Sequence, residues 1–125
     1  MSRTVPDKLG FKPGMTARVF ALPEGVDLAL PEGEAPALIV AFVATAADVA
    51  PRLAEALPLY RRGGALWFAY PKKTGAIKTD ISRDSGWEPL AAHDLLPVTQ
   101  IAIDATWSAL RFRYRDEIPT LTRKF

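Results

Sequence analysis

The apolar residues of the chain gather in short continuous runs separated by a stretch of helical spacing, which predicts strands that alternate with helices. Residues 37–43, ALIVAFV, and residues 65–71, ALWFAYP, are continuously apolar, as expected of strands that are covered on both faces. Between them, residues 45–62 carry apolar side chains at helical spacing. A strand, a helix and a strand in this order predict a βαβ unit whose two strands are parallel neighbours.

Local signals predict where this helix begins and ends. Asp48 is suited to cap its regular part, and Pro51 then falls in the first turn, where a missing N–H is harmless. Pro58 is expected to end or kink the helix near Leu57.

The remaining predicted strands lie near the two ends of the chain. Residues 16–22, TARVFAL, predict a first strand, and residues 98–104 and 108–115 predict a hairpin joined by Ala-Thr-Trp. The last strand alternates apolar residues with arginines, which predicts one buried face and a charged face at the edge of the sheet. The alternating residues are Leu110, Arg111, Phe112, Arg113, Tyr114 and Arg115.

Between residues 80 and 95 the pattern predicts a second crossover made of two short helical pieces that break at Gly86. Asp80 or Thr79 is expected to cap the first piece. The apolar face of this region comprises Trp87, Leu90, Ala91 and Leu95.

Together these elements predict one Rossmann-like domain over residues 1–125, a three-layer α/β/α fold with a mostly parallel sheet of about five strands. An antiparallel C-terminal hairpin is expected at one edge. Residues 1–14 are interpreted as an N-terminal arm and residues 116–125 as a C-terminal tail.

Composition narrows the class of protein. The chain has 125 residues, 49% of them hydrophobic and 24% charged, which is typical of one soluble globular domain. A formal net charge of +2 does not suggest nucleic acid binding. With no cysteine, disulfides and thiolate chemistry are excluded, and a single histidine, His93, excludes a multi-histidine metal site within one chain. Because no signal peptide or membrane span is recognised, we expect a cytoplasmic protein without a membrane partner.

Residues 59–71, LYRRGGALWFAYP, resemble the Leu-Lys-Pro-Gly-Gly turn and following strand of class I methyltransferases. The resemblance covers roughly residues 37–115 and implies a Rossmann-type architecture with a helix, a strand and an antiparallel hairpin strand at its end. That family carries a glycine-rich turn after its first strand, for S-adenosylmethionine, whereas RVFALPEGVD here has only Gly25. No cofactor residue is therefore carried over, and no cofactor is expected.

Three motifs are similar to those of a family of small uncharacterised bacterial proteins, a domain of unknown function. They are KPGM at residues 12–15, GALWFAYPKK…TD at residues 64–80, and IDATWSALRF at residues 103–112. This resemblance spans nearly the whole chain and implies no known activity.

The first candidate site is the stretch YPKKTGAIKTD, which follows a predicted parallel strand at its carboxyl end. Ligands of open α/β sheets bind beyond these ends, where helix N-termini present free N–H groups. Three lysines and nearby hydroxyls would suit a phosphate or carboxylate, although Asp80 would compete for the same N–H groups. The alternative is a solvated loop in which Asp80 is only a cap. The candidate residues are Tyr70, Lys72, Lys73, Lys78, Thr79, Asp80 and Ser82.

The second candidate site is the turn IDATWS. Trp107 and Ser108, beside Asp104, would form a wall for a planar ligand, or Trp107 would bury its ring over the end of the hairpin. The three arginines of the last strand would bind an acidic partner or nucleic acid, or form a solvated face.

Acid–base chemistry has two weaker candidates. His93 lies near the end of a helical stretch, where it is either a catalytic base or a charge that suits the helix dipole. Asp80 and Asp84 have the spacing of an acid–base pair, which is also common on solvated helices.

Three functions follow as hypotheses. The first is a non-catalytic module that binds an anionic small molecule or a protein partner at residues 70–82. The second is a transferase with a degenerate methyltransferase-like site. The third is nucleic acid binding through Arg111, Arg113, Arg115 and the basic tail. The oligomeric state, the ligand and any reaction stay open.

The loop hypothesis makes a testable prediction. Replacing Lys72, Lys73 and Lys78 together by serine should leave stability nearly unchanged, because a surface loop contributes little to the core. The same variant should lose affinity for anionic ligands in a thermal-shift titration with phosphate and nucleotides. Equal affinity in the variant and the parent would exclude the lysines from the site.

Overall fold

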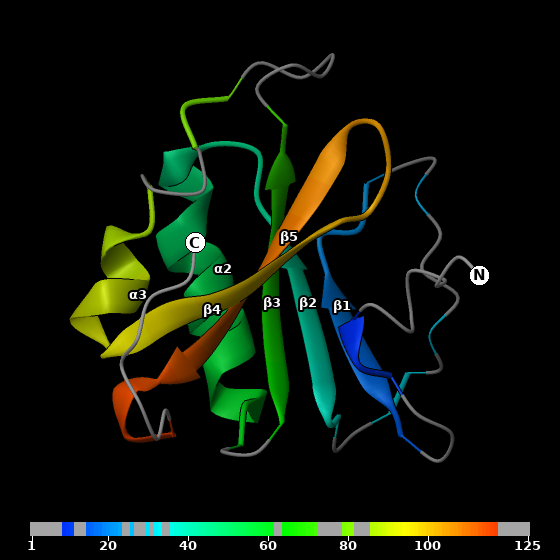
Figure 1. The fold of residues 1–125 in the computed structure, drawn as a ribbon, viewed down its shortest axis with the longest axis vertical. Coiled ribbons are helices and arrows are strands. Elements are labelled where there is room, and N and C mark those ends of the chain that lie inside the picture. Colours follow the sequence, from blue (N-terminus) through cyan, green and yellow to red (C-terminus); the bar gives the residue numbers. More distant parts are fainter. Residues whose placement is uncertain are drawn as a thin grey trace.

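The computed structural model describes residues 9–11, 15–23, 26, 30, 32–33, 36–61, 64–72, 79–81 and 86–117. Within them, five strands form one sheet in the order β1-β2-β3-β5-β4 (Figure 1). The strands are β1 (Ala17–Phe20), β2 (Leu38–Phe42), β3 (Ala65–Pro71), β4 (Leu95–Ala102) and β5 (Trp107–Tyr114).

The sheet is mixed rather than mostly parallel. β1 pairs with β2, and β2 pairs with β3, in parallel, as the βαβ pattern predicts for the second of these pairs. β5 pairs in antiparallel fashion with β3 on one side and with β4 on the other. The prediction that the arginine-rich strand forms the sheet edge is therefore wrong, because β4 is the outer strand of the hairpin.

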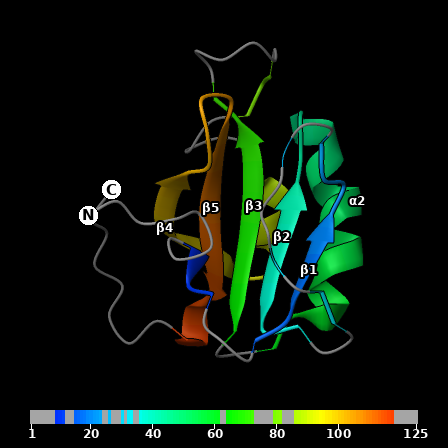
Figure 2. The ribbon, with the colours of Figure 1, turned by 90° about the vertical axis from the view of Figure 1, so that its right-hand side faces the viewer.

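The helices α2 and α3 cover one face of this sheet. α2 (Ala46–Ala56), the 3-10 turn η1 (Leu57–Leu59) and α3 (Glu88–Ala92) lie on the same side, and Figure 2 shows α2 behind the sheet. Apolar residues of α2 and α3 pack there against alternate residues of β2, β3 and β5. This cluster includes Ile39, Val49, Leu53, Leu66, Phe68, Leu90, Leu110 and Phe112.

The opposite face is covered by residues from the N-terminal part of the chain. Leu9 is fully buried there, and its carbonyl oxygen accepts a hydrogen bond of 3.0 Å from Trp67 Nε1. Phe11, Val26 and Leu30 pack against the same cluster. The predicted three-layer α/β/α fold with a mostly parallel sheet is thus wrong: the sheet is mixed, and α2 and α3 both lie on the same face of it.

α2 begins earlier than its sequence predicts. Thr45 is the N-cap, and the Asp48 carboxylate reaches back to accept hydrogen bonds from the N–H groups of Ala44 and Thr45, at 3.1 and 3.2 Å. Asp48 is thus the third helical residue rather than the cap, and Pro51 lies inside the helix. The predicted end near Leu57 is confirmed, because Leu57 is the C-cap and η1 follows.

The second helical region ends earlier than predicted, and most of its predicted first piece, residues 82–85, lies outside the described residues. Gly86 has a φ of 101°, a conformation that favours glycine, and it marks the predicted break just before α3. Asp94 has a φ of 63° and ends the helical region, so Leu95 is the first residue of β4 rather than part of a helical face. This left-handed turn redirects the chain from the helix layer into the sheet.

Phe68 provides a test of the core on the helical side. It is fully buried, and its ring centroid lies 5.9 Å from that of Trp87 and 5.8 Å from that of Phe112. Phe68→Ala should lower the free energy of unfolding by about 3–5 kcal/mol in urea titrations, because a cavity replaces the ring. Leu22→Ala, at a side chain that is 48% exposed, should change it by less than about 0.5 kcal/mol. Equal losses in the two variants would contradict this assignment of the core.

Candidate functional site

The carboxyl ends of the three parallel strands meet at one edge of the sheet, which lies at the top of Figure 1. The turn between β4 and β5 lies at this edge, because Lys72 N, just after β3, donates a 2.8 Å hydrogen bond to Thr106 O. α2 also begins there, four residues after the end of β2. Strand ends, a turn and a helix start therefore converge on one edge.

A cavity of about 260 Å³ lies at this edge. Two of its lining side chains are aromatic: Phe42 ends β2, Trp107 begins β5, and their ring centroids are 5.1 Å apart in an edge-to-face arrangement. The cavity is thus bounded by the sheet, by the chain after β1 and by the first turns of α2. Its lining residues are Ala21, Pro23, Phe42, Val43, Ala44, Asp48, Arg52 and Trp107.

Two charged residues of α2 line this cavity. Arg52 Nε donates to the carbonyl oxygen of Phe42 at 3.0 Å, and Arg52 Nη1 donates to Glu55 Oε1 at 2.7 Å. The first contact fixes the guanidinium at the carboxyl end of β2. A guanidinium has five N–H donors, so it can keep both contacts and still donate to a ligand. Asp48, in contrast, directs its carboxylate to two backbone N–H groups of the β2–α2 connection.

Ala21 lines the cavity in an unusual backbone conformation. It follows β1 directly and has a φ of 57°, in the left-handed region that an L side chain disfavours by about 1–2 kcal/mol. Such outliers cluster at functional sites, because the surrounding structure holds them in place. Ala21 is therefore a strained position at the rim of the cavity.

Asp80 contacts a different helix from the one that the sequence predicts. Its Oδ1 accepts a 2.7 Å hydrogen bond from Ala46 N, the first residue of α2. Thr79 Oγ1 accepts a 3.0 Å hydrogen bond from Ile81 N, which holds the local turn. Asp80 is thus a cap supplied from a distant part of the chain. Because it uses an N–H group at the start of α2, an anion bound there would compete with it.

The structure brings part of the predicted lysine-loop site together. Lys72 is partly buried and lies at the carboxyl edge, and Tyr70 OH accepts a 2.9 Å hydrogen bond from Gln100 Nε2 on the helical side of the sheet. Lys73, Lys78 and Ser82 lie outside the described residues. Their predicted role in anion binding stays a prediction.

The predicted tryptophan turn is well defined. Trp107 is 5% exposed and Ser108 is 6% exposed, so both belong largely to the interior, and Trp107 also lines the cavity. Asp104 Oδ1 accepts hydrogen bonds from Thr106 N at 2.8 Å and from Trp107 N at 2.7 Å. These contacts hold the turn that presents the indole ring. Ser108 pairs with Tyr70 in the β3–β5 register and packs within the sheet.

Sequence reasoning missed Ala21, Asp48 and Arg52 as cavity residues. The run RVFALPEGVD has only Gly25 where a glycine-rich turn would mark a site, and in sequence a lone arginine on a helix is indistinguishable from a solvated one. Their positions in the chain could have identified them, because residues that follow parallel strands and the first turns of the next helix lie together at the carboxyl edge of the sheet.

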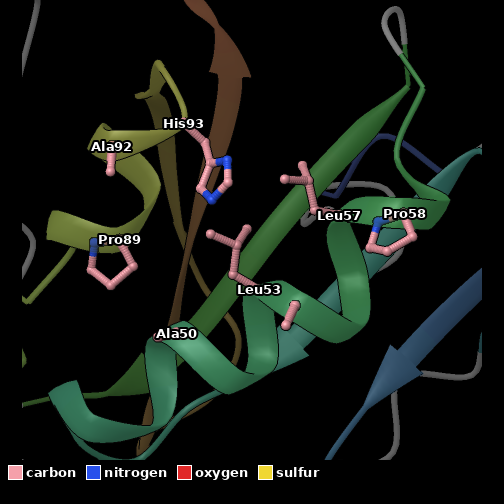
Figure 3. A pocket seen from close by; sticks show the side chains of 8 residues that line it. Ala50, Leu53, Leu57, Pro58, Pro89, Ala92 and His93 are labelled. Carbon is pink, nitrogen blue, oxygen red and sulfur yellow. The ribbon is translucent and has the colours of Figure 1, made fainter.

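A second, larger cavity of about 500 Å³ lies between α2 and α3. Figure 3 shows the His93 imidazole pointing from the end of α3 toward Leu53 and Leu57. Among the described residues, none is hydrogen-bonded to that imidazole, so the geometry gives the proposed catalytic base no partner. The lining residues are Ala50, Leu53, Ala54, Leu57, Pro58, Pro89, Ala92 and His93.

Comparisons with protein-family models, curated proteins and solved structures found no match. The resemblances to class I methyltransferases and to the bacterial domain of unknown function therefore stay predictions. None of the helices in the described ranges is long and apolar enough to cross a bilayer.

The contact between Asp80 and α2 can be tested directly. Asp80→Ala should lower the free energy of unfolding by about 1 kcal/mol, because an N-terminal N–H loses its acceptor and the helix dipole loses a favourable charge. Asp80→Asn should lose less, since it keeps an acceptor oxygen. The amide of Ala46 should exchange with solvent faster in the alanine variant by NMR. Unchanged exchange at Ala46 would show that the contact is not formed in solution.

Proposed function

We propose that this chain binds a small molecule that has a flat apolar part and an anionic group, in the cavity between β1, β2 and the start of α2. The observation that carries the proposal is the placement of Phe42, Trp107 and Arg52 around one cavity at the carboxyl ends of parallel strands. Ligands of α/β sheets bind at this edge, where the connections diverge.

The lining favours this class of ligand. Most of the cavity residues are apolar, as in ligand sites generally, where a few placed polar groups fix the orientation. The aromatic pair offers ring edges and faces to a planar group. Arg52 supplies the positive charge, and its planar fork suits carboxylate or phosphate better than a lysine would.

The polar groups favour binding over catalysis. Asp48 is the acidic residue of the lining, and its carboxylate is hydrogen-bonded to Ala44 N and Thr45 N. Both bonds use Oδ2, so this oxygen holds the shape of the connection and is not available to take a substrate proton as a general base. The transferase hypothesis stays a prediction with no contact of its own to support it.

Tryptophan indole signals in NMR provide the test. The indole of Trp107 lies at the cavity, that of Trp87 lies in the core on the helical side, and that of Trp67 is hydrogen-bonded to Leu9. Titration with adenosine 5′-monophosphate should shift the Trp107 signal to saturation and leave the Trp87 signal in place. At ten times the Kd, the bound ligand should raise the free energy of unfolding by about 1.4 kcal/mol.

The variant Arg52→Met, which keeps the aliphatic stem, should weaken binding roughly tenfold or more through loss of a charged hydrogen bond. Arg52→Lys should be intermediate, and Arg61→Met, at an exposed arginine outside the cavity lining, should bind like the parent. Each variant is compared by the shift that the ligand adds to its own baseline stability. If neither adenosine 5′-monophosphate nor S-adenosylmethionine moves the Trp107 signal, the cavity is not a site for this class of ligand.

A further inference from the structure

Two arginines of β5 lie on the sheet face opposite the helices. Trp107 and Ala109 belong to the cluster on that face, and side chains two apart along a strand point the same way, so Arg111 and Arg113 face that side too. In the register of the sheet, Arg111 lies beside Trp67 of β3, and Arg113 lies beside Leu96 of β4. Arg113 is six residues from Trp107, which is about 20 Å along a strand. The pair is thus well separated from the cavity described above.

Both guanidinium groups contain a buried donor without an acceptor. Arg111 Nη2 donates to Gly64 O at 3.1 Å, which holds this side chain near the amino end of β3. In the part of the chain that the structure describes, Arg111 Nε and Arg113 Nε are both covered and have no hydrogen-bond partner. A buried donor left unpaired lowers stability, and it lowers it more when the group is charged. Two such donors on neighbouring side chains are exceptional and require an explanation.

The charges around Arg111 and Arg113 compensate their positive charge poorly. The pKa of Arg111 is lowered, first by burial and then by the positive charge of Arg113. Glu117 is the carboxylate close enough to oppose that effect, but its Oε1 accepts hydrogen bonds from Tyr60 OH at 2.6 Å and from Tyr114 N at 2.9 Å. This same contact with Glu117, after burial, raises the pKa of Tyr60. Among the described residues, Glu117 is thus the one carboxylate that acts on Arg111, and it is already hydrogen-bonded to Tyr60 and Tyr114.

We propose that Arg111 and Arg113 together bind an oxyanion, a phosphate or carboxylate group, on the sheet face opposite the helices. Guanidinium groups bind these anions through pairs of parallel N–H donors, and Nε is one member of such a pair. An anion between the two side chains supplies acceptors for both Nε–H groups and reduces the repulsion between the charges. Both residues are partly exposed, and an ion would reach their covered Nε–H groups by inserting between the two side chains. The site is independent of the cavity ligand.

The Nε–H signals of the arginines in proton–nitrogen NMR report on this site directly. Sodium phosphate should shift the signals of Arg111 and Arg113 together, with one midpoint below about 1 mM, which corresponds to a binding free energy beyond about 4 kcal/mol. Sodium chloride at equal ionic strength should not reproduce the shift. The indole signal of Trp67 should follow the phosphate, and that of Trp107 should stay in place.

Matched variants separate a site from a general positive surface. Arg113→Lys keeps the charge but removes the planar fork and should weaken phosphate binding roughly tenfold. Arg115→Lys, at the exposed arginine that pairs with Asp94 at 3.1 Å, should leave phosphate binding unchanged.

Acetate and adenosine 5′-monophosphate distinguish a carboxylate site from a free or substituted phosphate site. Saturable binding of phosphate, acetate or adenosine 5′-monophosphate supports the proposal. Shifts that stay linear to tens of millimolar, equal shifts in chloride, or equal losses in the two variants would overturn it.

Discussion

Every residue of β3 is buried, and this strand requires apolar cover on both faces of the sheet. On one face α2 and α3 supply that cover, and on the other the N-terminal residues supply it, with Leu9 at the centre. β5 needs the same cover, because its pairing with β3 places Leu110 next to Phe68 and Phe112 next to Leu66.

Much of the local structure could be predicted because it depends on neighbouring residues. The run ALWFAYP forms β3 within the predicted bounds, and the apolar run before the first helix forms β2. The helix and the C-terminal hairpin also follow from periodicity and turn length. Their ends differ by a few residues, since contacts such as that of Asp48 with Thr45 decide where a helix starts.

The arrangement of the strands was harder to predict. The arginines of β5 suggested an edge, although β4 is the edge strand and contains Pro97, a residue that interior strands rarely tolerate. Pro97 was therefore the residue from which the edge position of β4 could have been predicted. The expected helix layers on both faces failed because βαβ reasoning assumes a helical crossover, whereas Val26 and Leu30, in the connection between β1 and β2, are not helical and pack against the second face. The contact of Asp80 with Ala46 joins residues 34 positions apart and has no local signature.

The left-handed alanine after β1 has a consequence for recognition. Glycine would relieve the strain at Ala21, but it would also widen the range of conformations open to the chain before folding and at the rim. A methyl group disfavours the left-handed conformation, so the contacts around Ala21, and not its own preference, keep it there. The position beside the cavity therefore stores local strain that any later change at this rim would release or increase.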